Sequence, residues 1–170
     1  MKNFLAGLLL GVILLGFGML VYLRLGLVGV RADAPVPHWV ARLLYTGIHA
    51  SVRRSISEAR SPRPAGDDTL IAGGKLYLND CVGCHGEPGK PPSEFGRTFY
   101  PPVPQFPHQG TDYSVAEVFW IAKHGIRRTG MAAQSSSYTD PQLWTVATFI
   151  TRMRNLPPNV VKAIQQNPAN

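Results

Sequence analysis

The sequence predicts an all-α protein with one membrane-spanning helix, and three observations lead to this prediction. Residues 4–23 are twenty residues without a charged side chain, which at about 1.5 Å rise per residue can cross a hydrocarbon layer of roughly 30 Å. Residues 38–56 carry apolar side chains at every fourth position, which is typical of an amphipathic helix. Residues 66–157 contain three further segments with helical periodicity or helix caps.

The apolar segment lies between Lys2 and Arg24. It is longer than the roughly 7–15 apolar residues of a secretory signal, and Pro35 directly after Ala32-Asp33-Ala34 makes that sequence a poor cleavage site. We therefore expect residues 1–30 to be an uncleaved N-terminal anchor rather than a cleaved signal peptide.

Residues 31–65 are expected to connect this anchor to the domain that follows. Residues 1–65 hold eight Lys/Arg and two acidic residues, a net charge of +6, whereas residues 66–170 hold nine basic and eight acidic residues, a net charge of +1. The helix expected near 38–56 has three interpretations: it packs on the following domain, it lies at a lipid surface, or it docks a partner subunit or anionic headgroups.

The domain of residues 66–157 is expected to contain three main helices. A serine and a glutamate three residues apart form a capping box at the start of the second, and a threonine and a glutamine form one at the start of the third. The sequence after residue 157 is expected to be a C-terminal tail, 158–170. The expected limits of the three helices are 68–79, 114–124 and 139–155.

The motif Cys81-Val82-Gly83-Cys84-His85 contains both cysteines of the chain. It is typical of covalent haem attachment, in which the two thiols add to the haem vinyl groups and the histidine binds the iron. A structural zinc site would need a second Cys/His pair at similar spacing, and a thioredoxin-like redox site would need a preceding strand, whereas a helix is expected here. The sequence therefore predicts one covalent haem c with its iron.

A second iron ligand is expected on the opposite face of the haem. Met131 follows Gly130 in a loop between two predicted helices, whereas Met153 lies in the last helix and two other methionines lie in the membrane region. A gap-filling core methionine is the alternative interpretation of Met131, and His108 and His124 are rival ligands. The predicted cofactor-binding residues are Cys81, Cys84, His85 and Met131, of which His85 and Met131 bind the iron.

Residues 66–157 resemble a class I c-type cytochrome domain of the membrane-anchored monohaem type. The resemblance rests on Gly73 and Tyr77 before the haem motif, on Gly130-Met131, and on Phe149 in the closing helix. It implies the class I fold, three main helices around the haem, with Gly73 and Tyr77 against Phe149 where the first and last helices cross.

The resemblance also implies roles for the two loops beside the haem. The Pro-rich loop 86–110 would wall the haem, and a proline carbonyl, of Pro101 or Pro102, would accept the ring N–H of His85. The match departs from the family at Ala132, where members usually have proline after the methionine, which predicts a less rigid loop around Met131.

The function expected from this resemblance is single-electron transfer outside the bacterial cytoplasmic membrane, by a shuttle or by the cytochrome subunit of a larger respiratory or photosynthetic complex. The chain shows no acid–base pair and no nucleophile with a base, so it is not expected to be an enzyme by itself. Two alternatives remain: a haem enzyme or gas sensor in which Met131 is displaced, and a mainly structural haem subunit.

The expected partners are redox proteins or complex subunits, and membrane lipid through residues 4–23. We expect no nucleic-acid partner and no small-molecule substrate. The expected location is single-pass in the cytoplasmic (inner) membrane with the haem domain on the periplasmic side. A count of positive charges alone would favour the opposite orientation, because Arg24 and Arg31 follow the span. We give more weight to the haem, because covalent attachment of c-type haem takes place on the outer side of the membrane.

Overall fold

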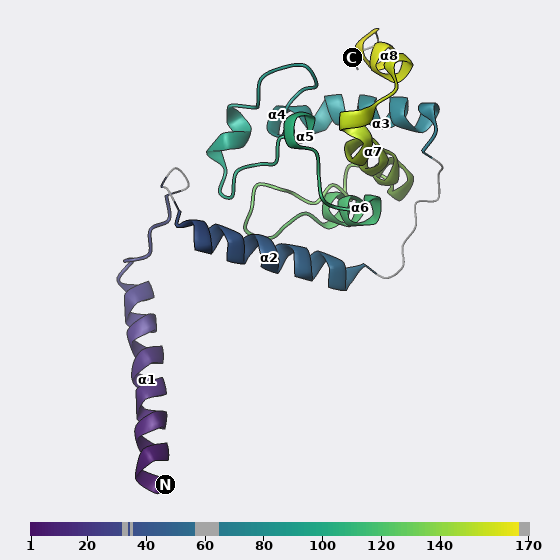
Figure 1. Cartoon of the computed structure of the whole chain (residues 1–170). Coiled ribbons are helices and arrows are strands. Elements are labelled where there is room, and N and C mark those ends of the chain that lie inside the picture. The colour runs from purple at the N-terminus through teal and green to yellow at the C-terminus, as the bar shows by residue number, and fades with distance from the viewer. Residues whose placement is uncertain (32–33, 35, 57–64, 167–170) are drawn as a thin grey trace. The chain divides into compact units, whose positions relative to one another are not determined.

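The computed structural model describes residues 1–31, 34, 36–56 and 65–166 (Figure 1). Within these ranges every regular element is a helix, which confirms the predicted all-α class. The chain divides into two units, Met1–Ala32 and Asp33–Asn170.

The first unit consists mainly of helix α1, Lys2–Arg24. It contains the predicted apolar segment, and none of its residues is buried in the structure. It is long and apolar enough to cross a membrane.

The second unit begins with helix α2, His38–Ser55, which lies against α6, Val115–His124. In its C-terminal half Val52 is 2% exposed and the ring of His49 stacks on Tyr113 with centroids 4.0 Å apart. Nearby, Arg53 Nε lies 3.2 Å from Glu117 Oε1. Of the three interpretations of this helix, the structure therefore shows the first: α2 packs on the following domain.

The core forms where α3, Asp67–Asp80, crosses α7, Asp140–Arg152. A side chain at Gly73 would place its Cβ 2.7 Å from Phe149 Cβ, and the rings of Tyr77 and Phe149 lie 5.6 Å apart. The two helices can approach this closely only because position 73 has no side chain. The contact implied by the resemblance is confirmed.

Helices α6 and α7 begin at the predicted capping boxes. The Ser114 hydroxyl accepts the backbone N–H of Glu117, and the Glu117 carboxylate accepts the backbone N–H of Ser114. Gly125, at φ 67°, ends α6. The rings of Phe119 and Trp144 stack 4.0 Å apart and join α6 to α7.

Helix α8, Pro158–Gln166, occupies much of the segment that was expected to be a tail. Val160 and Ile164 are buried, and Ile164 contacts Gly74 of α3 so closely that a Cβ there would lie 2.9 Å from Ile164 Cγ1. Two consecutive prolines suggested a stop, but proline is well tolerated in the first turn of a helix. The remaining short helices are α4 Val82–His85, η1 Phe95–Thr98, α5 Phe106–Gln109 and η2 Met153–Asn155.

Acid is expected to loosen the contact between α2 and α6. Burial by itself raises the pKa of Glu117, but hydrogen bonds from Ser114 and Arg53 outweigh it and hold that pKa below its ordinary 4.5. A lowered pKa stabilises the fold fully above pH 4.5, and this contribution is lost as the pH falls through the folded pKa. Hydrogen-exchange protection of α2, corrected for intrinsic rates, should therefore stay level from pH 7 to pH 4.5 and fall at lower pH.

The matched variants separate this ion pair from general acid effects. Glu117→Gln should show less protection of α2 at neutral pH and a flatter pH dependence. Arg53→Ala should cost about 0.2–1 kcal/mol, because the Arg53 side chain is 68% exposed. Arg54→Ala, at the exposed neighbouring position, should change little. An unchanged acid response in Glu117→Gln would assign the effect to other carboxyl groups.

Candidate functional site

The two cysteines and His85 lie in one tight turn at the end of α3. Cys81 ends α3 and precedes the single-turn α4, and the His85 N–H donates to the Cys81 carbonyl at 2.9 Å. Gly86, at φ 88°, turns the chain away, and the buried Tyr77 hydroxyl donates to its carbonyl at 2.6 Å. Both cysteines are half-buried. The sequence motif thus becomes a rigid turn fastened to the core helix.

The imidazole of His85 is held in one orientation. Its Nδ1 lies 2.9 Å from the carbonyl oxygen of Pro104, and its ring stacks on Phe106 with centroids 4.5 Å apart. A carbonyl oxygen only accepts hydrogen bonds, so Nδ1 carries the proton and Nε2 keeps its lone pair. Burial lowers the pKa of His85, and the bond to Pro104 opposes this only in part, so the neutral ring is favoured.

The proline that accepts this bond is Pro104, and the expectation of Pro101 or Pro102 is wrong. The next residue, Gln105, bonds to the Cys84 carbonyl, and Val103 N–H donates to Gly96 O at 3.0 Å. These two bonds hold residues 103–105 beside the turn, which brings the Pro104 carbonyl to the histidine.

Gln105 is a site residue that the sequence analysis missed. Its side chain is 8% exposed, and its Nε2 donates to the carbonyls of Cys84 at 2.9 Å and Val103 at 3.0 Å. Its Oε1 accepts the backbone N–H of Ser93 at 2.7 Å. A lone amide side chain between Pro104 and Phe106 was the only signal in the sequence. Gln105 joins the haem-motif turn to two points within the Pro-rich loop, Ser93 and Val103.

Gln105→Leu is expected to destabilise the domain by about 1–3 kcal/mol, because it leaves three half-buried backbone groups without their partner. It should also broaden the orientations of the His85 ring and so shift the reduction potential of the haem-loaded protein. Denaturant unfolding and redox titration measure the two effects. Gln109→Leu, an exposed amide at the end of α5, is the matched control and should change neither. Equal behaviour of the two variants would contradict a positioning role for Gln105.

Met131 lies in a loop whose backbone is fixed on both sides of the residue. Its N–H donates to Thr129 Oγ1 at 3.1 Å, and its carbonyl accepts the N–H of Ile126 at 2.9 Å. A Cβ at Gly130 would lie 2.6 Å from Phe99 Cε1, so the Pro-rich loop packs directly on this loop. The side chain of Met131 is half-buried. These bonds hold the backbone of the loop at a position where family members usually have proline after the methionine.

The histidines other than His85 have other surroundings. His108 Nε2 lies 3.0 Å from the Lys90 carbonyl, and His124 is exposed at the end of α6 against Trp120. His49 lies between Tyr45 and Tyr113, and its buried Nε2 has no hydrogen-bond partner. Within the described ranges, no group of three His, Cys, Asp or Glu residues could hold a metal ion.

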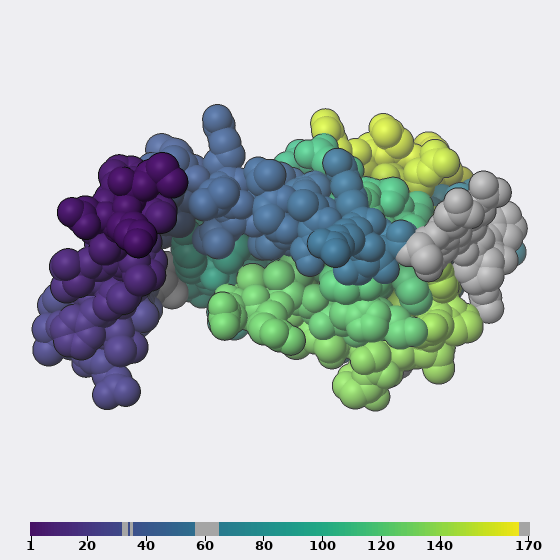
Figure 2. Space-filling model, turned by 90° about the horizontal axis from the view of Figure 1, so that it is seen from below, coloured from purple at the N-terminus to yellow at the C-terminus, as the bar shows by residue number. Residues whose placement is uncertain are grey.

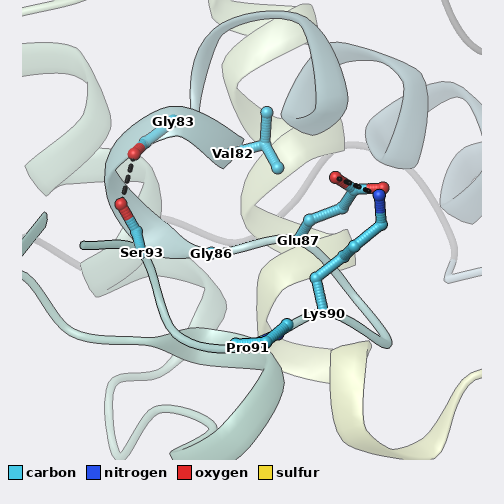
Figure 3. Close-up of a pocket in the computed structure, with 7 residues that line it drawn as sticks. All are labelled: Val82, Gly83, Gly86, Glu87, Lys90, Pro91 and Ser93. Carbon is cyan, nitrogen blue, oxygen red and sulfur yellow. Dashed lines mark hydrogen bonds and ion pairs between the residues drawn. The ribbon is translucent and has the colours of Figure 1, made fainter. Parts of the chain in front are cut away.

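A pocket lies against the haem-motif turn, on the side of Val82 and Gly83. Its volume is about 260 Å³, it is open to solvent, and Figure 3 shows the Ser93 hydroxyl bonded to the Gly83 carbonyl and Lys90 paired with Glu87 in it. None of the four predicted haem residues lines it. Its lining residues are Val82, Gly83, Gly86, Glu87, Lys90, Pro91 and Ser93.

The residues present fit a covalent haem. Burial, with the carboxylate of Asp80 and the neighbouring Cys84, raises the pKa of Cys81 to about 12, so its thiol is neutral. Redox-active CxxC motifs have lowered thiol pKa values instead. Two thiols in one turn, an imidazole with a free Nε2 and a thioether on a fixed loop are the donor set of haem c. The buried Tyr100 hydroxyl has no hydrogen-bond partner, and a carboxylate of a bound group would satisfy it.

Comparison with known proteins gives one family match. Residues 68–150, a little under half of the chain, match the family model described as cytochrome C oxidase, cbb3-type, subunit III. The match begins in α3 and ends in α7, and it includes the haem-motif turn and the Met131 loop. No curated protein and no solved structure matches the chain.

Proposed function

We propose that residues 68–150, which match the family model, form a class I c-type cytochrome domain with covalently bound haem c, and that the chain is a membrane-anchored carrier of single electrons. The observation that carries the proposal is the Cys81–His85 turn, in which the Pro104 carbonyl fixes the proton of His85 on Nδ1. The free Nε2 is the atom that binds iron in a c-type site.

The residues of the chain have separate tasks in this proposal. Haem c, when bound, supplies a one-electron Fe(III)/Fe(II) couple. The Cys81 and Cys84 thiols would hold it through thioether bonds. The His85 Nε2 and the Met131 thioether would be its two protein ligands to iron, which would leave no iron position for a substrate. A protein with this ligand set would carry electrons rather than act as an enzyme by itself. Pro104 and Gln105 keep the imidazole in place, which limits reorganisation when the charge changes.

In the proposed arrangement α1 crosses the bacterial cytoplasmic membrane once, with the domain on the periplasmic side. The length and composition of α1 support the span, and the covalent haem supports the side, because c-type haem is attached there. The family model describes a subunit of an oxidase. We therefore favour the cytochrome subunit of a respiratory complex over a free shuttle.

Spectroscopy of the purified, haem-loaded full chain tests the carrier function. We expect one haem per chain, a one-electron redox titration, and in the oxidised protein the weak red absorption band of sulfur-to-iron charge transfer. The reduced protein should not bind CO readily. A high-spin spectrum or rapid CO binding would instead support the haem enzyme or gas sensor.

Gentle detergent extraction followed by native mass measurement tests the subunit role. A constant set of co-purifying redox subunits supports a complex, and a monomer with one haem supports a shuttle. Proteolytic removal of residues 1–31 from the haem-loaded protein in membranes should weaken its membrane attachment, so that high salt and mild detergent release the domain; release that needs the same conditions as for the intact chain would contradict anchoring by α1.

A further inference from the structure

The exposed apolar surface of the second unit is concentrated on one helix. Across the described part of residues 33–170, five large hydrophobic side chains are strongly exposed. One is Phe95, and the other four belong to two consecutive turns of α2. Exposed apolar side chains that gather in one place mark an interaction surface rather than ordinary scatter. The four residues are Trp39, Leu43, Leu44 and Tyr45.

Trp39 and Leu43 point away from the domain, and Leu44, which is 44% exposed, lies on the flank between them and Val52. Trp39 is 70% exposed and Leu43 64% exposed, whereas Val52, which packs towards α6, is buried. Leu43 and Val52 are nine residues apart, which is about two and a half helical turns, so they lie on opposite sides of α2. Figure 2 shows α2, in blue, running over the domain with its outer side open. We call Trp39, Leu43 and Leu44 the outer face of α2.

The chemistry of this face suits the interface of a lipid bilayer. Tryptophan and leucine beside arginine are typical of helices that lie in the headgroup region. Residues 36–56 carry Arg42, Arg53 and Arg54 and no acidic residue, and cations there are attracted to anionic lipids. Three side chains supply far less area than the roughly 800 Å² that each partner of a stable protein complex buries.

The short connection between α1 and α2 also keeps α2 close to the bilayer that α1 is proposed to span. Only thirteen residues, 25–37, join the end of α1 to the start of α2, and even fully extended they reach about 45 Å. Within this connection Leu25, Leu27 and Val30 are also exposed. A helix held this close to a membrane meets its surface at high effective concentration.

We infer that the outer face of α2 lies in the interface of the same bilayer that α1 spans, and that Arg42 reaches the lipid phosphates. This inference rests on the membrane-anchoring part of the proposed function. Because the C-terminal half of α2 packs on α6, the contact would fix the tilt of the cytochrome domain over the membrane. The domain would then present one defined side to its redox partners.

Spin labels in nanodiscs test this position. The haem-loaded full chain is placed singly in nanodiscs of phosphatidylcholine and phosphatidylglycerol. One cysteine is introduced at a time, as Leu43→Cys, Leu14→Cys or Ser136→Cys; thioether bonds to haem leave no native thiol to label. Collisional relaxation by oxygen, which concentrates in lipid, is compared with relaxation by a water-soluble nickel chelate.

The expected ratio of oxygen to nickel relaxation is above one at position 43 and position 14, and below one at the exposed position 136. A ratio below one at position 43 together with a ratio above one at position 14 would overturn the inference, while the proposal that α1 spans the membrane would still hold. A label at 43 shielded from both reagents would also overturn it, since protein would then cover the face. A ratio below one at position 14 would refute the proposal that α1 spans the membrane.

Discussion

Met131→Ala is expected to abolish the sulfur-to-iron band and to lower the reduction potential by roughly a few tenths of a volt, within the approximately 0.8 V that axial ligands span. A thioether stabilises Fe(II) relative to Fe(III), so its loss favours the oxidised state. The vacated position should also let the reduced protein bind CO. Redox titration and absorption spectra of the haem-loaded full chain measure all three effects.

Met153→Leu is the matched control for this prediction. Met153 is a buried core methionine in η2, and its replacement by a side chain of similar volume should cost less than about 1.5 kcal/mol of stability. It should leave the band and the potential unchanged. If Met131→Ala keeps the band, Met131 is not the ligand, and another methionine sulfur, of which Met153 is the first to test, binds the iron.

Gly73→Ala is expected to have the largest effect on the fold, a loss of about 1–3 kcal/mol or more of unfolding free energy. The added methyl group would meet the Thr145 carbonyl oxygen and would lie 2.7 Å from Phe149 Cβ. These atoms belong to the α7 backbone and to the base of a fully buried side chain, so they cannot move aside without separating α3 from α7. Denaturant unfolding of the haem-loaded protein measures the loss.

Gly47→Ala is the control that separates packing from helix propensity. Gly47 is also inside a helix, but no atom lies within 4 Å of the Cβ that alanine would add. The substitution should stabilise the protein by about 0.5–1 kcal/mol, since alanine favours helix over glycine. Stabilisation by both substitutions would show that the α3–α7 crossing can relax, contrary to the close contact described above.

Local sequence patterns were sufficient for most of the fold. The capping boxes at Ser114 and Thr139 and the glycine at position 125 act through bonds to residues a few positions away. Such signals can be recognised without tertiary information. The haem motif is likewise local, because two thiols and an imidazole on one turn are already placed for a single porphyrin. The Gly73–Phe149 contact is not local; only the family resemblance suggested it.

The sequence by itself thus determined helices α1, α2, α3, α6 and α7, the apolar span and the cofactor. The tertiary structure alone decided that the proline carbonyl beside His85 belongs to Pro104, that Gln105 fixes the turn, and that α8 completes the core. These features depend on contacts between residues far apart in the chain, such as Gly74 with Ile164. No periodicity or motif encodes which distant carbonyl or methyl group reaches a site, because that depends on how all the helices pack together.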